Sequence, residues 1–397
     1  AVGKILEPGD RFVRTRVRIG GHPIPNQAGY EACLEILDLI DRAGPEDLFL
    51  CVMSGGSSAL MSCPVDGISL EDEQKTTDIL LKSGAAILEI NAVRRHISRM
   101  NGGQMARRIA ERGAELIGFN ISDYKSVITK YDNPNKSFDK DYYEGMEIGE
   151  IWGFVTDGFF KTDEEAKAYS KEVDLTYSSG RLTGGWLAGD LKFVDLNGDG
   201  FWNEGGKTVD QPGDRKILGN SRPTFSYGIN GSIRWMGFDA SVFFQGTGNH
   251  YWYPHGEMMP FWGCYSYPYL SYLPTDFLGK VWAEDNPNSY FPRARAYSSS
   301  GGYLSKVNDR YLQNIRYLRL KNLTVGYTIP VSLTKKAGID QIRIYFSGEN
   351  LCYWSPLKKH CKLIDPELAI SSGTYKGGTG TGYTMPRTFS FGVDITF

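Results

Sequence analysis

The sequence predicts a mixed fold: an α/β fragment with a parallel sheet, followed by an antiparallel β-sheet with the pattern of a partial transmembrane β-barrel. Up to residue 121 apolar residues recur at helical spacing between short strands, and after it they alternate with a period of two. Aromatic residues make up 13% of the chain, yet only four precede residue 124, namely Phe12, Tyr30, Phe49 and Phe119. This change in composition predicts two domains, residues 1–121 and 122–397.

Composition narrows the possible functions. The net charge of −2 gives no reason to expect nucleic acid or an anionic membrane surface as a partner. No apolar run of about 18 residues is present, so we expect no transmembrane helix. The chain opens on Ala1 without a signal peptide. The six cysteines form no CxxC pair and are interpreted as buried or incidental thiols, although Cys352 and Cys361 could pair in an oxidising compartment.

Local signals in the first part indicate alternating helices and strands. Asn26 is a suitable N-cap for a helix that Gly44-Pro45 ends. The continuous apolar run Asp47–Met53 predicts a buried strand. Ser69 and Asp72 form a capping-box pattern for a later helix. Together these signals predict an α/β unit with a mainly parallel sheet.

A glycine-rich turn follows the predicted strand and is the candidate phosphate- or substrate-binding site. Its residues are Ser54, Gly55, Gly56, Ser57 and Ser58. Glycines allow backbone N–H groups to approach an anion closely, and the hydroxyls add hydrogen-bond donors. The alternative is a tight strand-to-helix turn without a ligand.

Four motifs extend this interpretation: "GGHPIPN" (20–26), "VMSGGSSALMSCP" (52–64), "GISLEDEQKTTDILLKSGAAILEINAVRRHISRMNGG" (67–103) and "LIGFNISD" (116–123). In this order they resemble the glycerate 2-kinase family of the MOFRL type, and the resemblance covers nearly all of 1–123. It implies ATP-dependent phosphorylation of glycerate in the cytoplasm, with ATP and Mg²⁺ as cofactors.

The same resemblance implies catalytic roles for Arg94, Arg95 and His96 beside the cleft, where guanidinium groups suit carboxylate and phosphate. The alternatives are a solvated helix face for the two arginines and hydrogen-bonded structural histidines for His22 and His96. The chain departs from the family at Asn101, where a lysine is usual, and the resemblance stops at residue 123. We therefore expect an incomplete kinase that does not phosphorylate glycerate.

The second part predicts antiparallel strands with aromatic residues near their ends. The expected strands are Thr224–Trp235, Gly237–Gly248, Tyr317–Pro330, Gln341–Trp354 and Arg387–Phe397, the first two joined by a turn at Met236-Gly237. Their length and alternation are typical of transmembrane β-strands, and residues 249–310 fit extracellular loops. A soluble antiparallel sandwich or barrel is the alternative.

Five motifs support the membrane interpretation: "SDYKSVITKYDNP", "GEIWGFVTDGFFKTDEEA", "GDLKFVDLNGDGFWN", "YLRLKNLTVGYTIP" and the terminal "PRTFSFGVDITF". They resemble the C-terminal part of SusC/RagA-like TonB-dependent outer-membrane proteins across 124–397. The resemblance implies import of oligosaccharides or peptides, with TonB and a SusD-like surface lipoprotein as partners. The strand ending at Phe397 resembles the signal read by the barrel assembly machinery.

The segment "DLNGDG" is a candidate calcium site. Asp195, Asn197 and Asp199 alternate before Gly200, as oxygen ligands do in the first half of an EF-hand loop. The twelfth position is Gly206, so Glu204 or Asp210 would have to replace the usual acid. The alternative is an Asp/Asn/Gly turn without a metal.

The two resemblances meet at Ile121–Asp123, whose "ISD" satisfies both families. We therefore predict a chimera, because a cytoplasmic kinase and an outer-membrane barrel belong in different compartments. A transporter segment is the first functional hypothesis and a kinase fragment the alternative. With few strands the sheet is expected to stay open, with Arg387–Phe397 at one edge beside Gln341–Trp354, and Thr224–Trp235 or a preceding strand at the other.

Overall fold

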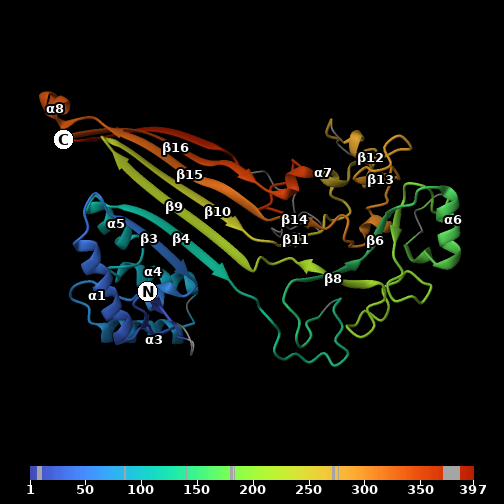
Figure 1. Cartoon of the computed structure of the whole chain (residues 1–397), viewed down its shortest axis with the longest axis horizontal. Coiled ribbons are helices and arrows are strands. Elements are labelled where there is room, and N and C mark those ends of the chain that lie inside the picture. Colours follow the sequence, from blue (N-terminus) through green and yellow to red (C-terminus); the bar gives the residue numbers. More distant parts are fainter. Residues whose placement is uncertain are drawn as a thin grey trace.

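One seven-stranded sheet runs through both parts of the chain (Figure 1). The computed structural model describes residues 1–6, 11–84, 86–139, 141–178, 182, 184–270, 273–275, 277–369 and 385–397. Across the sheet the strands are β17 (Thr388–Thr396), β16 (Gln341–Trp354), β15 (Tyr317–Thr328), β10 (Phe238–Thr247), β9 (Phe225–Trp235), β4 (Glu115–Asp123) and β3 (Leu48–Ser54). β3 and β4 run parallel, and the other neighbouring pairs are antiparallel. The mixed fold with a large antiparallel sheet is confirmed.

In its described residues the first part contains five helices, α1 (Gln27–Asp41), α2 (Ser57–Leu60), α3 (Leu70–Lys82), α4 (Ile87–His96) and α5 (Gln104–Glu111). Of these, α1 and α3 begin where the capping residues predict. The Asn26 side chain accepts a hydrogen bond of 2.9 Å from the Gly29 N–H at the start of α1. Ser69 Oγ accepts from the Asp72 N–H, and the Asp72 carboxylate accepts from the Ser69 N–H, so the predicted capping box is present.

The core of the first part lies on one face of β3. Phe49, Cys51 and Met53 point toward α1 and α5, whose buried side chains include Cys33, Leu37, Ile40, Met105 and Ile109. The opposite face carries Leu48, Leu50 and Val52, which are 62%, 64% and 65% exposed. The expectation of a strand buried on both faces is therefore wrong. Successive side chains alternate between faces, and in the described ranges the helices cover only one of them.

β4 joins the two parts through backbone pairing. One edge of β4 pairs in parallel with β3, and the other pairs antiparallel with β9, from Leu116 opposite Ser232 to Asp123 opposite Phe225. β4 therefore continues across the predicted boundary at residue 121 without a break. The backbone groups on both of its edges are satisfied by neighbouring strands.

The antiparallel strands lie where the alternating pattern predicts them, within one or two residues. β9 and β10 form a hairpin through Met236 and Gly237, whose φ angles are 48° and 86°. Two consecutive positive φ angles define a type I′ turn, which matches the right-handed twist of the flanking strands. Local turn chemistry thus sets the register of this hairpin.

The sheet has one apolar face and one polar face. On the apolar face Ile233, Ala240, Val325, Phe346 and Phe391 stand opposite one another across five strands. The neighbouring row on the polar face is Ser232, Ser241, Thr324, Ser347 and Ser390. The apolar face continues into the first part, because β4 and β3 place Ile117 and Leu50 beside Gly231, which lies on the same face as Ile233.

The sheet remains open, with β3 and β17 as its outer strands. In the part of the chain that the structure describes, β17 pairs with β16 alone, which confirms the expected C-terminal edge and its antiparallel neighbour. The other edge is β3, a strand that precedes Thr224–Trp235, in agreement with the second expectation.

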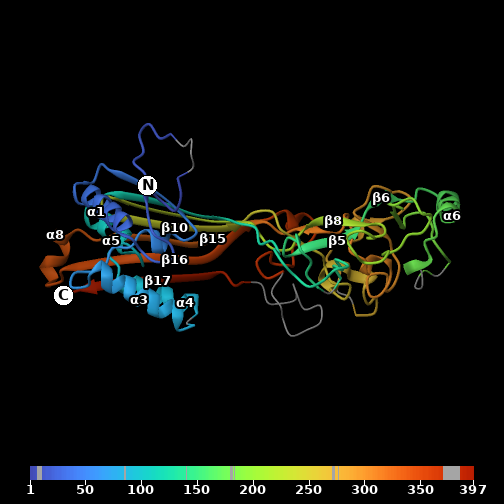
Figure 2. The ribbon, with the colours of Figure 1, turned by 90° about the horizontal axis from the view of Figure 1, so that it is seen from below.

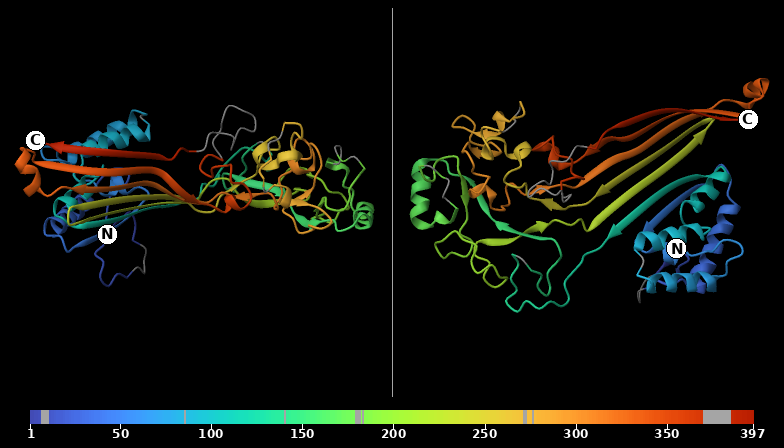
Figure 3. Two further views of the ribbon diagram at one scale, coloured as in Figure 1. Left: turned by 90° about the horizontal axis from the view of Figure 1, so that it is seen from above. Right: turned by 180° about the vertical axis from the view of Figure 1, so that it is seen from behind.

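The described residues of 124–223 and 249–316, here called the loop region, extend from one end of the sheet (Figures 2 and 3). Their short elements are β5 (Glu150–Phe154), β6 (Thr156–Phe159), α6 (Asp163–Glu172), β7 (Leu191–Phe193), β8 (Arg215–Asn220), β11 (Tyr251–Trp252), α7 (Met259–Trp262), β12 (Val281–Trp282), β13 (Phe291–Arg293) and β14 (Gln313–Asn314). Elsewhere lie β1 (Val2–Gly3), β2 (Arg18–Ile19) and α8 (Val331–Thr334).

The loop region has its own aromatic core. Trp202, Trp262, Tyr265, Tyr303 and Tyr311 are completely buried. The rings of Phe193 and Trp202 stack with centroids 4.1 Å apart. These long glycine- and tyrosine-rich segments therefore form a packed unit, because large rings bury enough surface to offset the ordering of the loops.

Charged side chains pair at the margin of this core. Glu204 bridges Lys207 at 2.8 Å and Lys306 at 3.2 Å. Burial by itself would raise the pKa of Glu204, but hydrogen bonds from Lys207 and Tyr177 and the charge of Lys306 hold it at about 2. The carboxylate therefore remains ionised in the folded protein well below its usual range.

Across the described ranges, no helix is long and apolar enough to cross a bilayer.

We predict that Gly237→Ala destabilises the hairpin. An alanine at φ 86° costs about 1–2 kcal/mol, and its Cβ would lie 3.0 Å from the carbonyl oxygen of Thr328. Gly231→Ala is the control, since its Cβ would meet only Val242 at 3.5 Å, an ordinary contact. Urea unfolding followed by circular dichroism measures both variants. Equal midpoints for the two would contradict the type I′ assignment.

We predict that Glu204→Gln flattens the acid side of the stability profile of the loop region. The folded pKa lies below the unfolded value, so the stabilisation by Glu204 is complete above about pH 4.5 and is lost as the pH falls toward about 2. Tryptophan fluorescence during urea unfolding at a series of pH values checks this. Glu284→Gln, at an exposed position, is the control. A profile unchanged by Glu204→Gln would show that the lysines do not stabilise this carboxylate.

Candidate functional site

The glycine-rich turn lies at the carboxyl end of β3, as the sequence predicts. β3 ends at Ser54, and α2 begins at Ser57. Gly56 caps α2 with a φ of 88°, and a Cβ there would lie 3.2 Å from the ring of His22. The structure therefore brings the "GGHPIPN" segment against the turn, although His22 and Gly56 are 34 positions apart in the sequence.

Arg94 is buried and faces away from solvent. It is 8% exposed, and its Nη2 donates a hydrogen bond of 3.0 Å to the carbonyl of Pro23. The buried Glu73 beside it accepts a hydrogen bond from the Ser62 hydroxyl. Burial raises the pKa of Glu73, and the Arg94 charge lowers it in part. Arg94 therefore ties α4 to the segment that holds His22.

Arg95 and His96 lie on α4 and are exposed. Arg95 Nε donates to the carbonyl of Asn91 at 3.2 Å, and His96 Nδ1 lies 2.7 Å from the carbonyl of Ala92. Both side chains thus bond to the preceding turn of their own helix. The three residues proposed as catalytic do not converge on one point: Arg94 packs inward, while the other two face solvent.

Asn101 occupies the position at which the resemblance expects a lysine. Its Nδ2 donates to the carbonyl of Ser58 at 3.1 Å and to that of Met61 at 3.2 Å. These bonds fasten the end of α2 to the loop before α5. Asn101 therefore supplies a structural clamp where a lysine would supply a cation.

A cavity of about 440 Å³ lies between the first part and the polar face of the sheet. Its lining comes from both parts and comprises Cys51, Met53, Ser57, Met61, Met100, Asn101, Gly102, Gly103, Met105, Ala106, Leu116, Gly118, Asn230, Gly231, Ser232, Ser241, Val242, Phe243 and Asn322. None of these lining residues is charged. Sequence reasoning identified Ser57 but missed Asn230, Phe243 and Asn322, because only the pairing of β4 with β9 brings them near.

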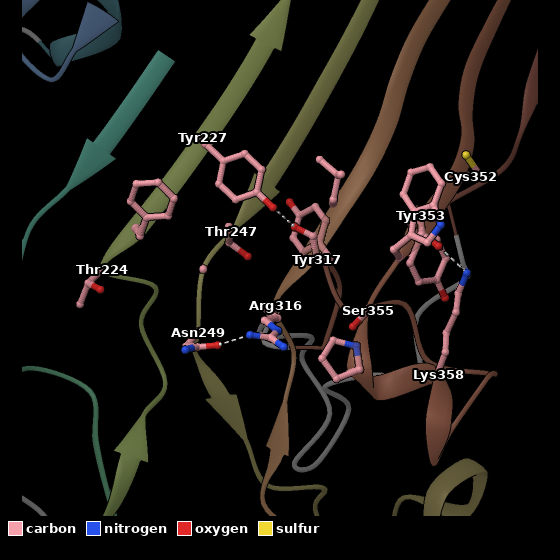
Figure 4. A pocket seen from close by; sticks show the side chains of 15 residues that line it. Thr224, Tyr227, Thr247, Asn249, Arg316, Tyr317, Cys352, Tyr353, Ser355 and Lys358 are labelled. Atoms are coloured by element: carbon pink, nitrogen blue, oxygen red, sulfur yellow. Dashed lines mark hydrogen bonds between the residues drawn. The ribbon is translucent and has the colours of Figure 1, made fainter. Parts of the chain in front are cut away.

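A wider hollow of about 1120 Å³ opens where the sheet meets the loop region (Figure 4). Aromatic side chains in its wall include Tyr227, Tyr317 and Tyr353. Arg316 donates to Asn249 Oδ1 at 3.2 Å, and Lys358 Nζ lies 3.6 Å from the centre of the Tyr353 ring. Aromatic faces beside cationic groups suit a polar organic ligand. Its residues come from four strands and from the segments that adjoin them, so no single sequence motif predicts the hollow.

The candidate calcium residues form a turn that is satisfied from within. The Asp195 carboxylate accepts 2.8 Å hydrogen bonds from the N–H groups of Gly198 and Gly200. Asn197 donates to the Asp199 carboxylate at 2.9 Å. Glu204, a possible replacement ligand, is taken by Lys207 and Lys306. Calcium binding stays a prediction, and it would require several of these hydrogen bonds to open.

The buried Asp214 closes the same turn and was missed by sequence reasoning. Its carboxylate accepts hydrogen bonds from the N–H groups of Leu196 at 2.7 Å and Asn203 at 2.8 Å. Within the described part of the chain, no three His, Cys, Asp or Glu side chains gather closely enough to hold a metal ion. The six cysteines, Cys352 and Cys361 included, are free thiols.

Comparison with known proteins finds two different kinds of relative for this chain. A family model described as "Domain of unknown function (DUF4147)" matches residues 4–127. Glycerate 2-kinase of Pyrococcus horikoshii is 39% identical over 149 residues, which cover 36% of this chain and 33% of the relative. D-glycerate 2-kinase of Thermotoga maritima is 42% identical over 103 residues, which cover 26% of this chain and 24% of the relative.

A relative of a different kind covers more of the chain. TonB-dependent receptor P3 of Formosa agariphila is 28% identical over 265 residues, which cover 64% of this chain and 22% of the receptor. The chain spans a third or less of the length of each of these three relatives. Homologues of glycerate 2-kinases thus cover the N-terminal part of the chain, and homologues of TonB-dependent receptors cover most of it, which is consistent with a chimera.

Proposed function

We propose that residues 122–397 are the C-terminal barrel segment of a SusC/RagA-like TonB-dependent importer of oligosaccharides or peptides, joined to an incomplete glycerate kinase fragment. The observation that carries this proposal is the two-faced sheet. Its apolar face is exposed along strands of a length that spans a bilayer, and similarity to TonB-dependent receptors supports the same assignment.

The exposed apolar face is most pronounced on β17. Phe389, Phe391, Val393 and Ile395 alternate along it and are 60%, 82%, 57% and 49% exposed. Ile344 on β16 and Ile233 on β9 extend the same face. Soluble monomers rarely expose contiguous apolar patches beyond a few hundred Å². Lipid acyl chains would cover this face without leaving backbone groups of the interior strands unpaired, whereas the outer edges of β3 and β17 would need further strands as partners.

The polar face and the hollow at its end suit contact with a nutrient. In a closed barrel the face opposite the lipid lines the lumen, where polar side chains are tolerated. The hollow of Figure 4 lies at the end of the strands beside the loop region. Its tyrosines and cations offer stacking surfaces and hydrogen-bond donors to sugar rings or peptide groups.

Three further proposals follow from this assignment. The barrel segment would reside in an outer membrane, and its full-length form would work with TonB and a SusD-like surface lipoprotein. Phe397 is 83% exposed at the end of β17, where the barrel assembly machinery could read it as a signal. The kinase-like part would belong to the cytoplasm, which favours an artificial join over an evolved fusion.

The kinase-like part does not fit an ATP–Mg²⁺ complex. Phosphoryl transfer depends on cations and a metal held around the transferred group. Ser57 opens onto a cavity whose described lining carries no charged side chain. The Arg94 guanidinium donates a hydrogen bond to the carbonyl of Pro23. Asn101, at the position where the resemblance expects a lysine, is uncharged and bonds to the carbonyl of Ser58. The glycine-rich turn therefore lacks the charged partners that a kinase reaction requires.

We predict that the chain does not phosphorylate glycerate. With ATP, Mg²⁺ and D-glycerate, formation of 2-phosphoglycerate should not exceed that of a heat-denatured sample, because positioning and electrostatics supply nearly all of phosphoryl-transfer catalysis. Chromatography coupled to mass spectrometry detects the product, and an intact glycerate 2-kinase serves as the positive control. ATP-dependent product formation by this chain would overturn the assignment of a kinase fragment.

We predict that Phe391 contacts lipid and Ser390 does not. The photoreactive residue benzoylphenylalanine replaces one or the other, and the chain is reconstituted into phospholipid vesicles. Because neighbouring side chains on β17 point to opposite faces, irradiation should crosslink lipid at position 391 several times more efficiently than at 390. Mass spectrometry of the peptide that contains both positions measures the yields. Equal yields at 390 and 391 would refute the proposed membrane face.

A further inference from the structure

We infer that the cavity between the two parts binds a neutral, planar heteroaromatic molecule of the purine class. This inference is independent of nutrient import and of glycerate phosphorylation. It rests on one row of side chains across the sheet and on the wall that faces it.

The floor of the cavity is a row of five residues on five adjacent strands. Cys51 stands opposite Gly118, Gly118 opposite Asn230, Asn230 opposite Phe243, and Phe243 opposite Asn322. All five line the cavity. Phe243 is thus flanked on its two sides by carboxamides, and Gly118 leaves open space beside Asn230.

The opposite wall is rich in sulfur. Met61, Met100 and Met105 contribute their side chains, and Gly102 and Gly103 add none. Met53 adds a fourth thioether from β3, beside Cys51 on the floor. Thioethers make favourable contacts with aromatic rings and adapt to irregular shapes. A flat ring lying on Phe243 would therefore have a polarizable surface above it and an aromatic surface below it.

The chemistry of the lining selects the ligand class. A charged group would be desolvated here without a counter-charge, since no lining residue is ionisable other than the Cys51 thiol. The side-chain carboxamides of Asn230 and Asn322 are exposed and bond to no other residue in the described part of the chain, so a purely apolar ligand would bury both without a partner. The ligand must therefore be uncharged and carry donors and acceptors at its edges.

The spacing of the two asparagines suits a bicyclic base. They stand two strand spacings apart, which is about 10 Å between their backbones. An asparagine carboxamide donates one hydrogen bond and accepts another, and it pairs in this way with the edge of adenine. A purine stacked on Phe243 presents such edges on both sides.

Protection of Cys51 from alkylation tests this inference at the site itself. The full chain in detergent micelles is treated with iodoacetamide, with and without adenine, and the labelled peptides are quantified by mass spectrometry. With adenine at about ten times its dissociation constant, alkylation of Cys51 should slow roughly tenfold, because only the unliganded fraction reacts. Cys352, which lines the other hollow, is the internal control and should not change.

Variants of the two asparagines, and ligands other than adenine, distinguish a purine site from a purely apolar crevice. Asn230→Ala and Asn322→Ala should each abolish most of the protection, whereas Asn120→Ala, a carboxamide on the same face outside the cavity, should retain it. Naphthalene, which has a similar shape but no polar edge, should protect poorly. Equal protection by naphthalene would show a purely apolar crevice and overturn the inference. Stronger protection by inorganic phosphate, or none by adenine at millimolar concentration, would overturn it as well.

Discussion

The antiparallel ladder between β4 and β9 is the interaction on which the remaining architecture depends. Each of these strands would otherwise end its own sheet with a row of unpaired N–H and C=O groups. Pairing them converts two edges into the interior of one sheet. The register also matters, because a slip by one residue would exchange the two faces of every strand beyond it. With Gly118 opposite Asn230, apolar side chains of both parts lie on one face.

This ladder has opposite consequences on the two sides of the sheet. On one side, helices α1 and α5 pack on β3. α5 and the segments before it face the polar side of the sheet across the cavity floored by Asn230, Phe243 and Asn322. On the other side, the exposed apolar face extends from Leu50 on β3 to Phe389 and Phe391 on β17. A membrane or a partner of similar polarity is the environment in which such a face is stable.

Charged residues in this molecule are mostly engaged by one another, and this limits the chemistry open to it. Glu73 and Arg94 are buried together, Glu204 is held by two lysines, and Asp195 is taken up by backbone N–H groups. Several groups that the sequence suggests as catalytic or metal-binding are therefore engaged within the protein, although Arg94 Nε is buried without a hydrogen-bond partner among the described residues. The two hollows are instead lined by aromatic rings, thioethers, carboxamides and hydroxyls, which suit recognition of organic ligands.

The sequence by itself determined the local elements. Asn26 and Ser69 start their helices, the type I′ turn at Met236-Gly237 forms, and the period-two pattern locates the strands, since each depends on neighbours within a few residues. The glycine-rich turn after β3 was predictable for the same reason. Only the tertiary structure decided which edge β4 pairs with, that β3 exposes one face, and that Asn230 and Asn322 flank Phe243. These features depend on strand register and on helix packing between residues far apart in the chain, and neither is encoded in any local pattern.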